Sequence, residues 1–299
     1  MLQIKAVNQT LAPRLGALIA VIFWGISFVA TKAALREIAP VTLIFTRFAL
    51  GTALLFVLAR LRRPISLPPG DAWGMLALMG FSGVFVHQML QAFGLTLTTA
   101  VQTGWLIGLI PIWSALLSVA LGRERFGPRK VAGLAGGFVG AALVISRGKF
   151  SSGTFQLPST RGDFLILLST INWAIYSLLA QNTIKRLGPT RSTAWSMLIG
   201  WLMLAPFFAA QHGWREWPQL SAAGWGAVLF LGIGCSGLGY LFWYGALERI
   251  EISRVAAFLY LEPLVTLITA VLLLSEPVSE PALLGGLIVL GSVYLMQRA

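Results

Sequence analysis

The side chains best suited to chemistry lie inside long apolar stretches of this sequence. His87 stands one helical turn before Gln91, so the two share a helix face, and Gln88 flanks that face. An imidazole and two amides in such a stretch predict hydrogen bonds to a polar solute, while a buried histidine satisfied by its neighbours is the alternative. The chain has one cysteine, Cys235, and no histidine and carboxylate cluster at metal spacing. We therefore expect no disulfide framework, no metal site and no cofactor.

Three charged side chains also fall within apolar stretches, where a charge is costly and faces a cavity or a partner. Lys32 and Arg47 lie toward the ends of their stretches. Three interpretations stay open for them: contact with a solute, an ion pair that stabilises the fold, or extension of the side chain to the membrane interface. Glu262 precedes Pro263, whose missing N–H and kink expose carbonyl groups that a polar site can use. Two interpretations of Glu262 stay open: a structural pair with Arg47 or Lys32, or a carboxylate that titrates as the protein works.

Aromatic side chains recur at helical spacing inside the apolar stretches. Trp24 shares a face with Phe28 and Thr31, one and two turns further on. Ordinary helix packing explains any single ring, but the set predicts a roomy cavity lined by rings, amides and one imidazole. The predicted ring residues of this cavity are Trp24, Trp105, Trp173, Tyr176, Tyr240 and Trp243.

Membrane helices are expected to position these residues, because the composition is too apolar for a water-soluble protein. Of 299 residues, 57% are hydrophobic and 11% are charged, and the mean hydropathy is +0.81. Soluble domains are about 45–50% apolar and about 25% charged, so a single water-soluble fold and a disordered chain are excluded. The apolar runs predict ten spanning helices. They are Leu15–Leu35, Val41–Leu61, Trp73–Leu95, Thr99–Leu121, Val131–Ser146, Phe164–Thr183, Ser192–Ala210, Ala222–Leu247, Ile252–Leu274 and Ala282–Met296.

The distribution of Lys and Arg predicts the orientation of these helices. With both termini inside, 15 basic residues fall in inside segments and 5 in outside segments, while Lys32 and Arg47 lie within spans. This bias predicts that both termini are cytoplasmic. It also explains the net charge of +12, since the basic residues set the orientation in the membrane and contact anionic lipid, so that nucleic-acid binding is not needed to explain it.

Landmark residues recur at nearly one offset along the chain. Trp24 and Trp173, Pro40 and Pro189, and Gly51 and Gly200 lie 149 residues apart. The pairs 152 residues apart are Gly80 and Gly232, Pro111 and Pro263, Glu124 and Glu276, and Gly133 and Gly285. Each copy holds five predicted spans, and an odd count inverts the second copy in the membrane, as in many transporters. At this offset Gln88 corresponds to Tyr240 and Gln91 to Trp243. We therefore expect the helix face that carries the two glutamines to meet the face that carries Tyr240 and Trp243. Pro111 and Pro263 mark corresponding helix breaks.

The motifs then resemble a known family. Trp24-Gly25-Ile26-Ser27-Phe28, with Lys32, Pro40 and Arg47 after it, resembles the first repeat of EamA-type members of the drug/metabolite transporter superfamily. Leu261-Glu262-Pro263 and the Gly285-Gly286 helix resemble the end of the second repeat. Within that superfamily the sequence is similar to the YddG-type exporters of aromatic amino acids. Two positions depart from symmetry, since Ile110 stands opposite Glu262 and Ser196 opposite Arg47.

The resemblance implies an all-α integral membrane protein of ten transmembrane helices in two inverted five-helix repeats, residues 1–149 and 150–299. It implies a secondary transporter, working as a monomer in the bacterial inner membrane, that exports aromatic amino acids and similar small amphipathic solutes by alternating access. Broad efflux of drug-like organic cations, held by ring faces, is the alternative.

Enzyme and scaffold interpretations fit the residues less well. Gly25-Ile26-Ser27-Phe28 has the G-x-S-x form of an intramembrane serine protease, but no histidine motif follows it. The chain has no phosphate-binding loop, so it is not an ATP-driven pump. A purely structural membrane protein leaves the duplicated halves unexplained.

Overall fold

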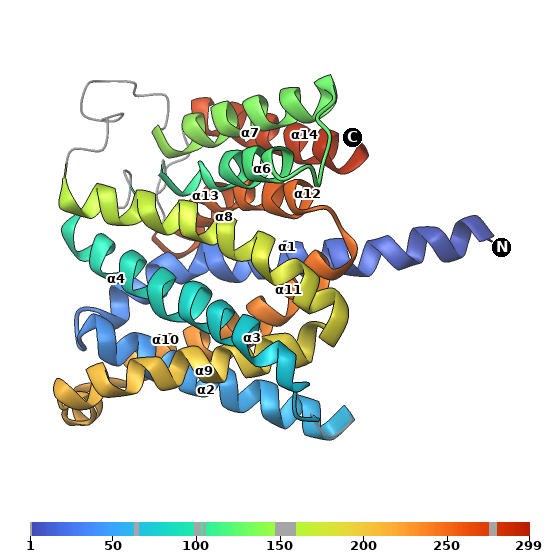
Figure 1. The fold of residues 1–299 in the computed structure, drawn as a ribbon. Coiled ribbons are helices and arrows are strands. Elements are labelled where there is room, and N and C mark those ends of the chain that lie inside the picture. Colours follow the sequence, from blue (N-terminus) through green and yellow to red (C-terminus); the bar gives the residue numbers. More distant parts are fainter. Residues whose placement is uncertain (1, 63–65, 99–102, 104–105, 147–159, 275–279) are drawn as a thin grey trace. The chain divides into compact units, whose positions relative to one another are not determined.

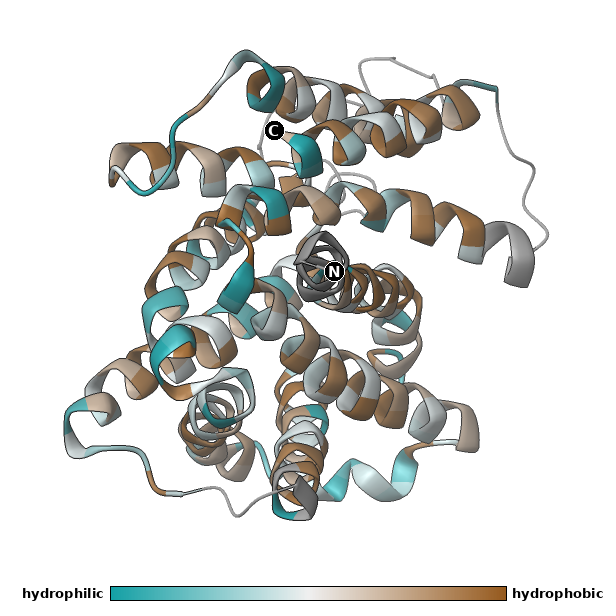
Figure 2. Cartoon of the chain, turned by 90° about the vertical axis from the view of Figure 1, so that its right-hand side faces the viewer, coloured by the Kyte–Doolittle hydropathy of each residue, from teal (hydrophilic) through white to brown (hydrophobic). Residues whose placement is uncertain are grey.

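The structure is a computed structural model of the chain, and it describes residues 2–62, 66–98, 103, 106–146, 160–274 and 280–299. Within these ranges every regular element is a helix (Figure 1). Nine helical stretches of the described chain are long and apolar enough to cross a membrane, and α6 (Ile110–Ala120) is a shorter apolar helix. Figure 2 shows apolar residues along these helices and hydrophilic residues concentrated near their ends and connections.

Most helices follow the predicted spans closely. The exceptions are α1, which begins at Leu2 and not at Leu15, and α6, which covers only Ile110–Ala120 of the predicted span Thr99–Leu121. Single helices are α1 (Leu2–Ala34), α2 (Pro40–Arg62), α7 (Pro128–Ser146), α8 (Arg161–Leu187), α9 (Pro189–Ala210) and α14 (Glu280–Arg298). The third stretch consists of α3 (Trp73–Met79), η2 (Gly80–Val86) and α4 (His87–Leu97), and the eighth of α10 (Ala222–Leu229), η5 (Phe230–Gly239) and α11 (Tyr240–Arg249). The ninth contains α12 (Ile252–Ala257), η6 (Phe258–Leu261) and α13 (Glu262–Leu274). Proline begins α2, α7 and α9, where its missing N–H removes no helix hydrogen bond.

The chain folds into two compact units that do not coincide with its two halves. The first unit contains Met1–Ala92 and Leu179–Ile250, and the second contains Phe93–Leu178 and Glu251–Ala299. Each unit therefore combines residues from both halves of the sequence. Helices α4 and α8 continue from one unit into the other.

In the first unit, helices from opposite halves pack through glycine. A Cβ on Gly80 of η2 would lie 2.8 Å from the Gly200 nitrogen of α9, and one on Gly51 of α2 would lie 3.1 Å from the Gly232 carbonyl oxygen of η5. These contacts need glycine because backbone lies against backbone. The sequence offsets relate Gly51 to Gly200 and Gly80 to Gly232, so the two contacts are counterparts of one another.

The third and eighth helical stretches each contain a π-helical segment, which the apolar pattern did not predict. The segment η2 covers Gly80–Val86, and η5 covers Phe230–Gly239. At the end of η2 the His87 N–H donates to the Ser82 carbonyl oxygen, five residues earlier. A π-helical segment turns the side chains after it relative to a regular α-helix and is frequent at functional sites. The two segments lie at corresponding positions of the repeat and immediately precede His87 and Tyr240.

Polar contacts join the connections at the two ends of the first unit. At one end, Arg186 and Asp71 form an exposed two-bond ion pair, with Nη1–Oδ2 and Nη2–Oδ1 distances of 2.6 and 3.0 Å. At the other end, Glu37 accepts hydrogen bonds from the Ser221 nitrogen and hydroxyl at 2.7 and 2.8 Å. The first end joins segments predicted to lie inside, and the second joins segments predicted to lie outside.

In the second unit, α7 and α14 pack along their lengths. A Cβ on Gly140 would lie 2.8 Å from the Gly285 oxygen, so the helices approach as closely as backbones permit. The Tyr260 ring lies against Gly137, and its hydroxyl donates to the Leu134 carbonyl oxygen at 3.1 Å. Tyr260 belongs to η6, which ends where the Glu262 N–H donates to the Leu259 carbonyl oxygen. That short 3₁₀ bond follows from Pro263, whose nitrogen carries no hydrogen for an α-helical bond to the same carbonyl.

Candidate functional site

Four predicted site residues form a cluster of rings and one amide inside the first unit. The Trp24 ring lies 5.9 Å from the Tyr240 ring and 5.1 Å from the Trp243 ring, centroid to centroid. The Gln88 Nε2 donates to the Tyr240 hydroxyl at 3.2 Å. Tyr240 and Trp243 are almost fully buried, whereas Trp24 is half-buried. We call these four residues the ring cluster.

Backbone carbonyl groups hold the ring cluster in place. The Trp24 Nε1 donates to the Cys235 carbonyl oxygen of η5 at 3.2 Å, and the Tyr240 hydroxyl donates to the Gly83 carbonyl oxygen of η2 at 3.2 Å. Gly239 leaves room for the indole, since a Cβ there would lie 2.9 Å from the Trp24 Nε1. Both π-helical segments thus supply acceptors. The Gln88–Tyr240 bond joins the two positions that the 152-residue offset relates, which is the meeting of faces expected from the sequence.

Arg47 lies beside the ring cluster on α2 and is 8% exposed. Its Nε donates to the Ser236 hydroxyl of η5 at 2.9 Å, and its guanidinium carbon lies 5.4 Å from the centre of the Phe48 ring. The Phe48 ring in turn lies 5.8 Å from the Tyr240 ring, edge to face. Sequence reasoning singled out Arg47 but had no signal for Ser236 as its partner, because the two are 189 residues apart.

The other predicted residues of the first unit take different environments. His87 is buried at the start of α4, next to Gln88, and Gln91 is half-buried one turn later. Lys32 is exposed in the last turn of α1, in agreement with a side chain that extends to the interface.

The remaining predicted site residues belong to the second unit or lie outside the described residues. Trp173 and Tyr176 are buried on α8, with ring centres 5.4 Å apart. Pro111 lies in the first turn of α6, and Pro263 follows Glu262 at the start of α13, so both prolines stand at helix starts. Glu262 is 6% exposed, and its carboxylate makes no hydrogen bond or ion pair with the described residues of its own unit. Trp105 lies outside the described residues, and its role stays a prediction.

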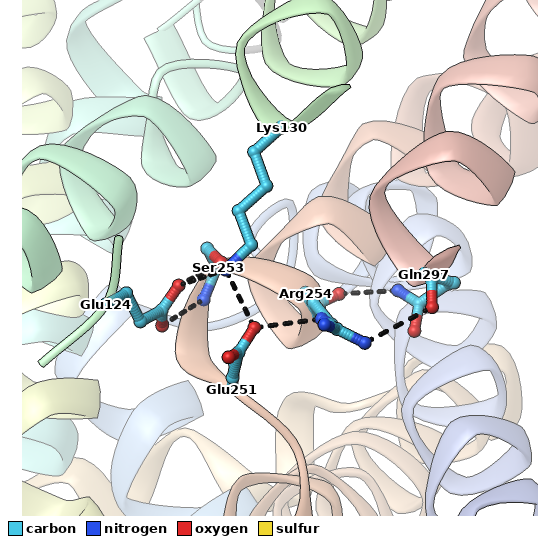
Figure 3. Close-up of polar contacts among 6 residues, drawn as sticks. All are labelled: Glu124, Lys130, Glu251, Ser253, Arg254 and Gln297. Carbon is cyan, nitrogen blue, oxygen red and sulfur yellow. Dashed lines mark hydrogen bonds and ion pairs between the residues drawn. The ribbon is translucent and has the colours of Figure 1, made fainter. Parts of the chain in front are cut away.

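Sequence reasoning missed a partly buried ion cluster in the second unit (Figure 3). The Lys130 Nζ lies 3.2 Å from Glu124 Oε2 and 2.7 Å from Glu251 Oε2. Glu124 also accepts from the Ser253 nitrogen at 3.1 Å and from the Ser253 hydroxyl. Arg254 donates to Glu251 at 2.9 Å and exchanges hydrogen bonds with Gln297 near the end of α14. The cluster ties the α6–α7 connection to α12 and α14.

Glu251 lies between two spans, and its surroundings act on its pKa in opposite directions. Partial burial raises the pKa of Glu251, while the neighbouring Lys130 and Arg254 outweigh burial and hold this pKa below its ordinary value of 4.5. Glu251 is therefore ionised at neutral pH. The cluster fastens helix ends. No group of His, Cys, Asp and Glu among the described residues could hold a metal ion.

Comparison with known proteins identifies the family. A model of the EamA-like transporter family matches residues 13–146 and, a second time, residues 160–298. The chain belongs to the EamA-like transporter family. An uncharacterized transporter of Archaeoglobus fulgidus is 31% identical over 274 residues, which cover 92% of this chain and 93% of that relative. This EamA-like transporter is thus a multi-pass membrane protein related to transporters along almost its whole length.

Two further likenesses are less close in sequence. A probable terminal-alkyne amino-acid exporter of Streptantibioticus cattleyicolor is 26% identical over 284 residues, covering 93% of this EamA-like transporter and 91% of that exporter. One crystal structure matches with a TM-score of 0.81 over 98% of this chain and 97% of its own, at 20% identity. At that identity the match bears on the fold alone.

Proposed function

We propose that this EamA-like transporter is a secondary transporter that exports aromatic amino acids and similar small amphipathic solutes across the inner membrane by alternating access. The ring cluster carries the proposal. Trp24, Tyr240 and Trp243 offer ring faces and edges inside membrane-spanning helices, and Gln88 adds a polar group beside them. Rings can stack on an aromatic side chain while the amide and His87 bind the polar end of the solute.

The proposed architecture is ten transmembrane helices in two inverted five-helix repeats, residues 1–149 and 150–299. The family model matches once in each half, and an odd number of helices in a half inverts its successor. Both termini are cytoplasmic in this proposal. The end of the first unit with Arg60, Arg62, Lys185, Arg186 and Arg191 then faces the cytoplasm, as the excess of positive charge requires.

The choice of amino acids as substrates is supported by the chemistry of the site and by one relative. An amino acid combines charged groups with a side chain, and the ring cluster contains the Gln88 amide and lies beside Arg47. The Streptantibioticus relative is named a probable amino-acid exporter. Efflux of organic cations is the alternative, because ring faces also attract cations.

The test is counterflow in proteoliposomes with phenylalanine, tryptophan and threonine as solutes. Trp243→Ala is expected to weaken phenylalanine and tryptophan transport several-fold and threonine transport less, because an aromatic pair contributes about 0.5–1.5 kcal/mol beyond area burial. Trp214→Ala is the matched control, since Trp214 is 44% exposed in a connection. Trp105→Ala and Trp173→Ala extend the same comparison to the other predicted rings.

Two results would contradict the proposal. Equal losses for all three solutes in Trp243→Ala would assign the ring to helix packing. Counterflow of organic cations without counterflow of any amino acid would favour the alternative.

A further inference from the structure

We propose that Arg47 is the anchor for the carboxylate of the transported solute, so that the substrate class is carboxylate-bearing and excludes simple organic cations. This inference rests on the proposed function and names the group that the site recognises. Arg47 is 8% exposed on a membrane-spanning helix. A charge in that position needs a partner or a polar cavity.

The first unit provides no carboxylate for Arg47. The unit contains four acidic side chains, and each is bound elsewhere: Glu37 by Ser221, Asp71 by Arg186, Glu216 by the Ala39 nitrogen, and Glu248 by Arg249. The guanidinium meets a hydroxyl through Nε, and its two Nη groups make no hydrogen bond with the described residues of the unit. Four N–H donors therefore stay available in a site that water scarcely reaches.

The chemistry of these donors favours one class of ligand. A guanidinium binds a carboxylate through two parallel charge-assisted hydrogen bonds. Ser236 fixes the orientation of the plane by accepting from Nε, which leaves the Nη edge for the ligand. A cationic solute at the same place would be repelled, because the repulsion between like charges is strong where little water screens it.

The position of Arg47 relative to the ring cluster suits a small aromatic amino acid. Phe48 lies between them, with its ring centre 5.4 Å from the guanidinium carbon and 5.8 Å from the Tyr240 ring centre. A solute whose carboxylate meets Arg47 can thus place an attached ring beside the ring cluster.

The experiment measures thermal stabilisation of the purified full-length protein by three probes that share one ring. The probes are phenylalanine, 3-phenylpropionate, which lacks the amine, and phenethylamine, which lacks the carboxylate. The wild type is expected to be stabilised by the first two and not by the third. In Arg47→Gln, the half-saturating concentration of the two carboxylates is expected to rise at least tenfold, while phenethylamine binds no worse than before.

Two further variants keep the result interpretable. Arg47→Lys retains the charge and loses the planar guanidinium, so we expect an intermediate loss of affinity for the two carboxylate probes. This variant keeps the test informative if Arg47→Gln does not fold. Arg186→Gln makes the same change at an exposed arginine of the first unit and is expected to alter binding of none of the probes.

The outcomes separate this inference from the proposed function. Equal weakening of all three probes in both Arg47 variants, unchanged carboxylate binding, or no carboxylate binding by the wild type would overturn the anchor. If Glu262→Gln strengthened the binding of the two carboxylates, Arg47 would already be neutralised in the wild type and the anchor would fail. If the wild type bound 3-phenylpropionate through Arg47 but showed no counterflow of phenylalanine, the transport proposal would fail and the anchor would stand.

Discussion

Single hydrogen bonds decide how the ring cluster is ordered. Tyr240 is 2% exposed, and its hydroxyl accepts from Gln88 while donating to the Gly83 carbonyl oxygen. Gln88 is 6% exposed, so its amide has little access to water. A buried polar group that loses its partner costs about 1–3 kcal/mol. The pair therefore contributes to stability mainly by satisfying the Gln88 amide.

We expect Tyr240→Phe and Gln88→Leu each to lower the free energy of unfolding by about 1–3 kcal/mol. The double variant should lose less than the sum, because Tyr240→Phe alone leaves the Gln88 amide unpaired and the second substitution removes that amide. The coupling should reach about 0.5–3 kcal/mol. Chemical denaturation in detergent measures all four corners of the cycle. Strictly additive losses would show that the hydroxyl and the amide do not interact.

At the scale of elements, the crossings between helices depend on glycine. Gly80 and Gly200 allow η2 and α9 to approach, and Gly51 and Gly232 do the same for α2 and η5. The π-helical segments begin near these crossings, at Gly80 and Phe230. Each π-helical segment thus contains the close contact with a neighbouring helix and also sets the direction of the side chains that follow it.

Gly80→Ala is expected to destabilise the protein by about 1–3 kcal/mol, since the added methyl group meets backbone atoms that cannot move aside. Gly74→Ala is the matched control on the preceding helix, where nothing lies within 4 Å of a new Cβ. That change should stabilise by up to about 1 kcal/mol through helix propensity. Thermal unfolding of both variants tests the contrast, and an equal response to the two substitutions would argue against a close crossing.

The ion cluster of the second unit fastens helix ends that are far apart in sequence. Lys130→Met removes the cation from two carboxylates, and breaking a buried pair in this way costs about 3–5 kcal/mol. Unfolding of the variant and the wild type at pH 7 measures the loss. Arg186→Gln, which breaks an exposed pair, should change stability much less.

The loss should also depend on pH through Glu251. Its pKa in the folded protein lies below the ordinary 4.5, so its ionised form stabilises the fold above that value. This stabilisation disappears as the pH falls through the folded pKa. We therefore expect the difference between wild type and Lys130→Met to stay constant from neutral pH to about 5 and to narrow below 4.5. A difference that widened on acidification would contradict the assigned direction.

At the scale of the whole molecule, the two compact units cut across the two halves of the sequence. In the first unit, α2 and η2 from the first half cross η5 and α9 from the second. This exchange makes each half depend on the other for its packing. The charged residues at the two ends of each unit can be compared with the orientation predicted from Lys and Arg.

The orientation can be tested by labelling intact cells with a membrane-impermeant thiol reagent. The parent is Cys235→Ala, although Cys235 itself is fully buried. Gln211→Cys, at an exposed position before a predicted outside connection, should react from outside, and Leu67→Cys, 70% exposed in a predicted inside connection, should not. Reaction of Leu67→Cys and protection of Gln211→Cys would reverse the topology.

The sequence by itself determined the membrane class, the helices and the correspondence between its halves. Hydropathy is a local property, so apolar runs and prolines located the helix bounds to within a few residues in most cases. The repeat offset also anticipated the contact between Gln88 and Tyr240, because related positions in duplicated helices meet when the helices pack symmetrically.

Tertiary structure alone decided the contacts that carry the site. Arg47 meets Ser236 across 189 residues, and Lys130 meets Glu251 across 121. Neither pair shares a repeat offset or a helix period, so no pattern in the chain relates them. The π-helical segments likewise contain glycines that lie against a neighbouring helix, which the sequence pattern did not indicate. Such features arise because packing, and not local propensity, selects which backbone and side-chain groups come within hydrogen-bonding distance.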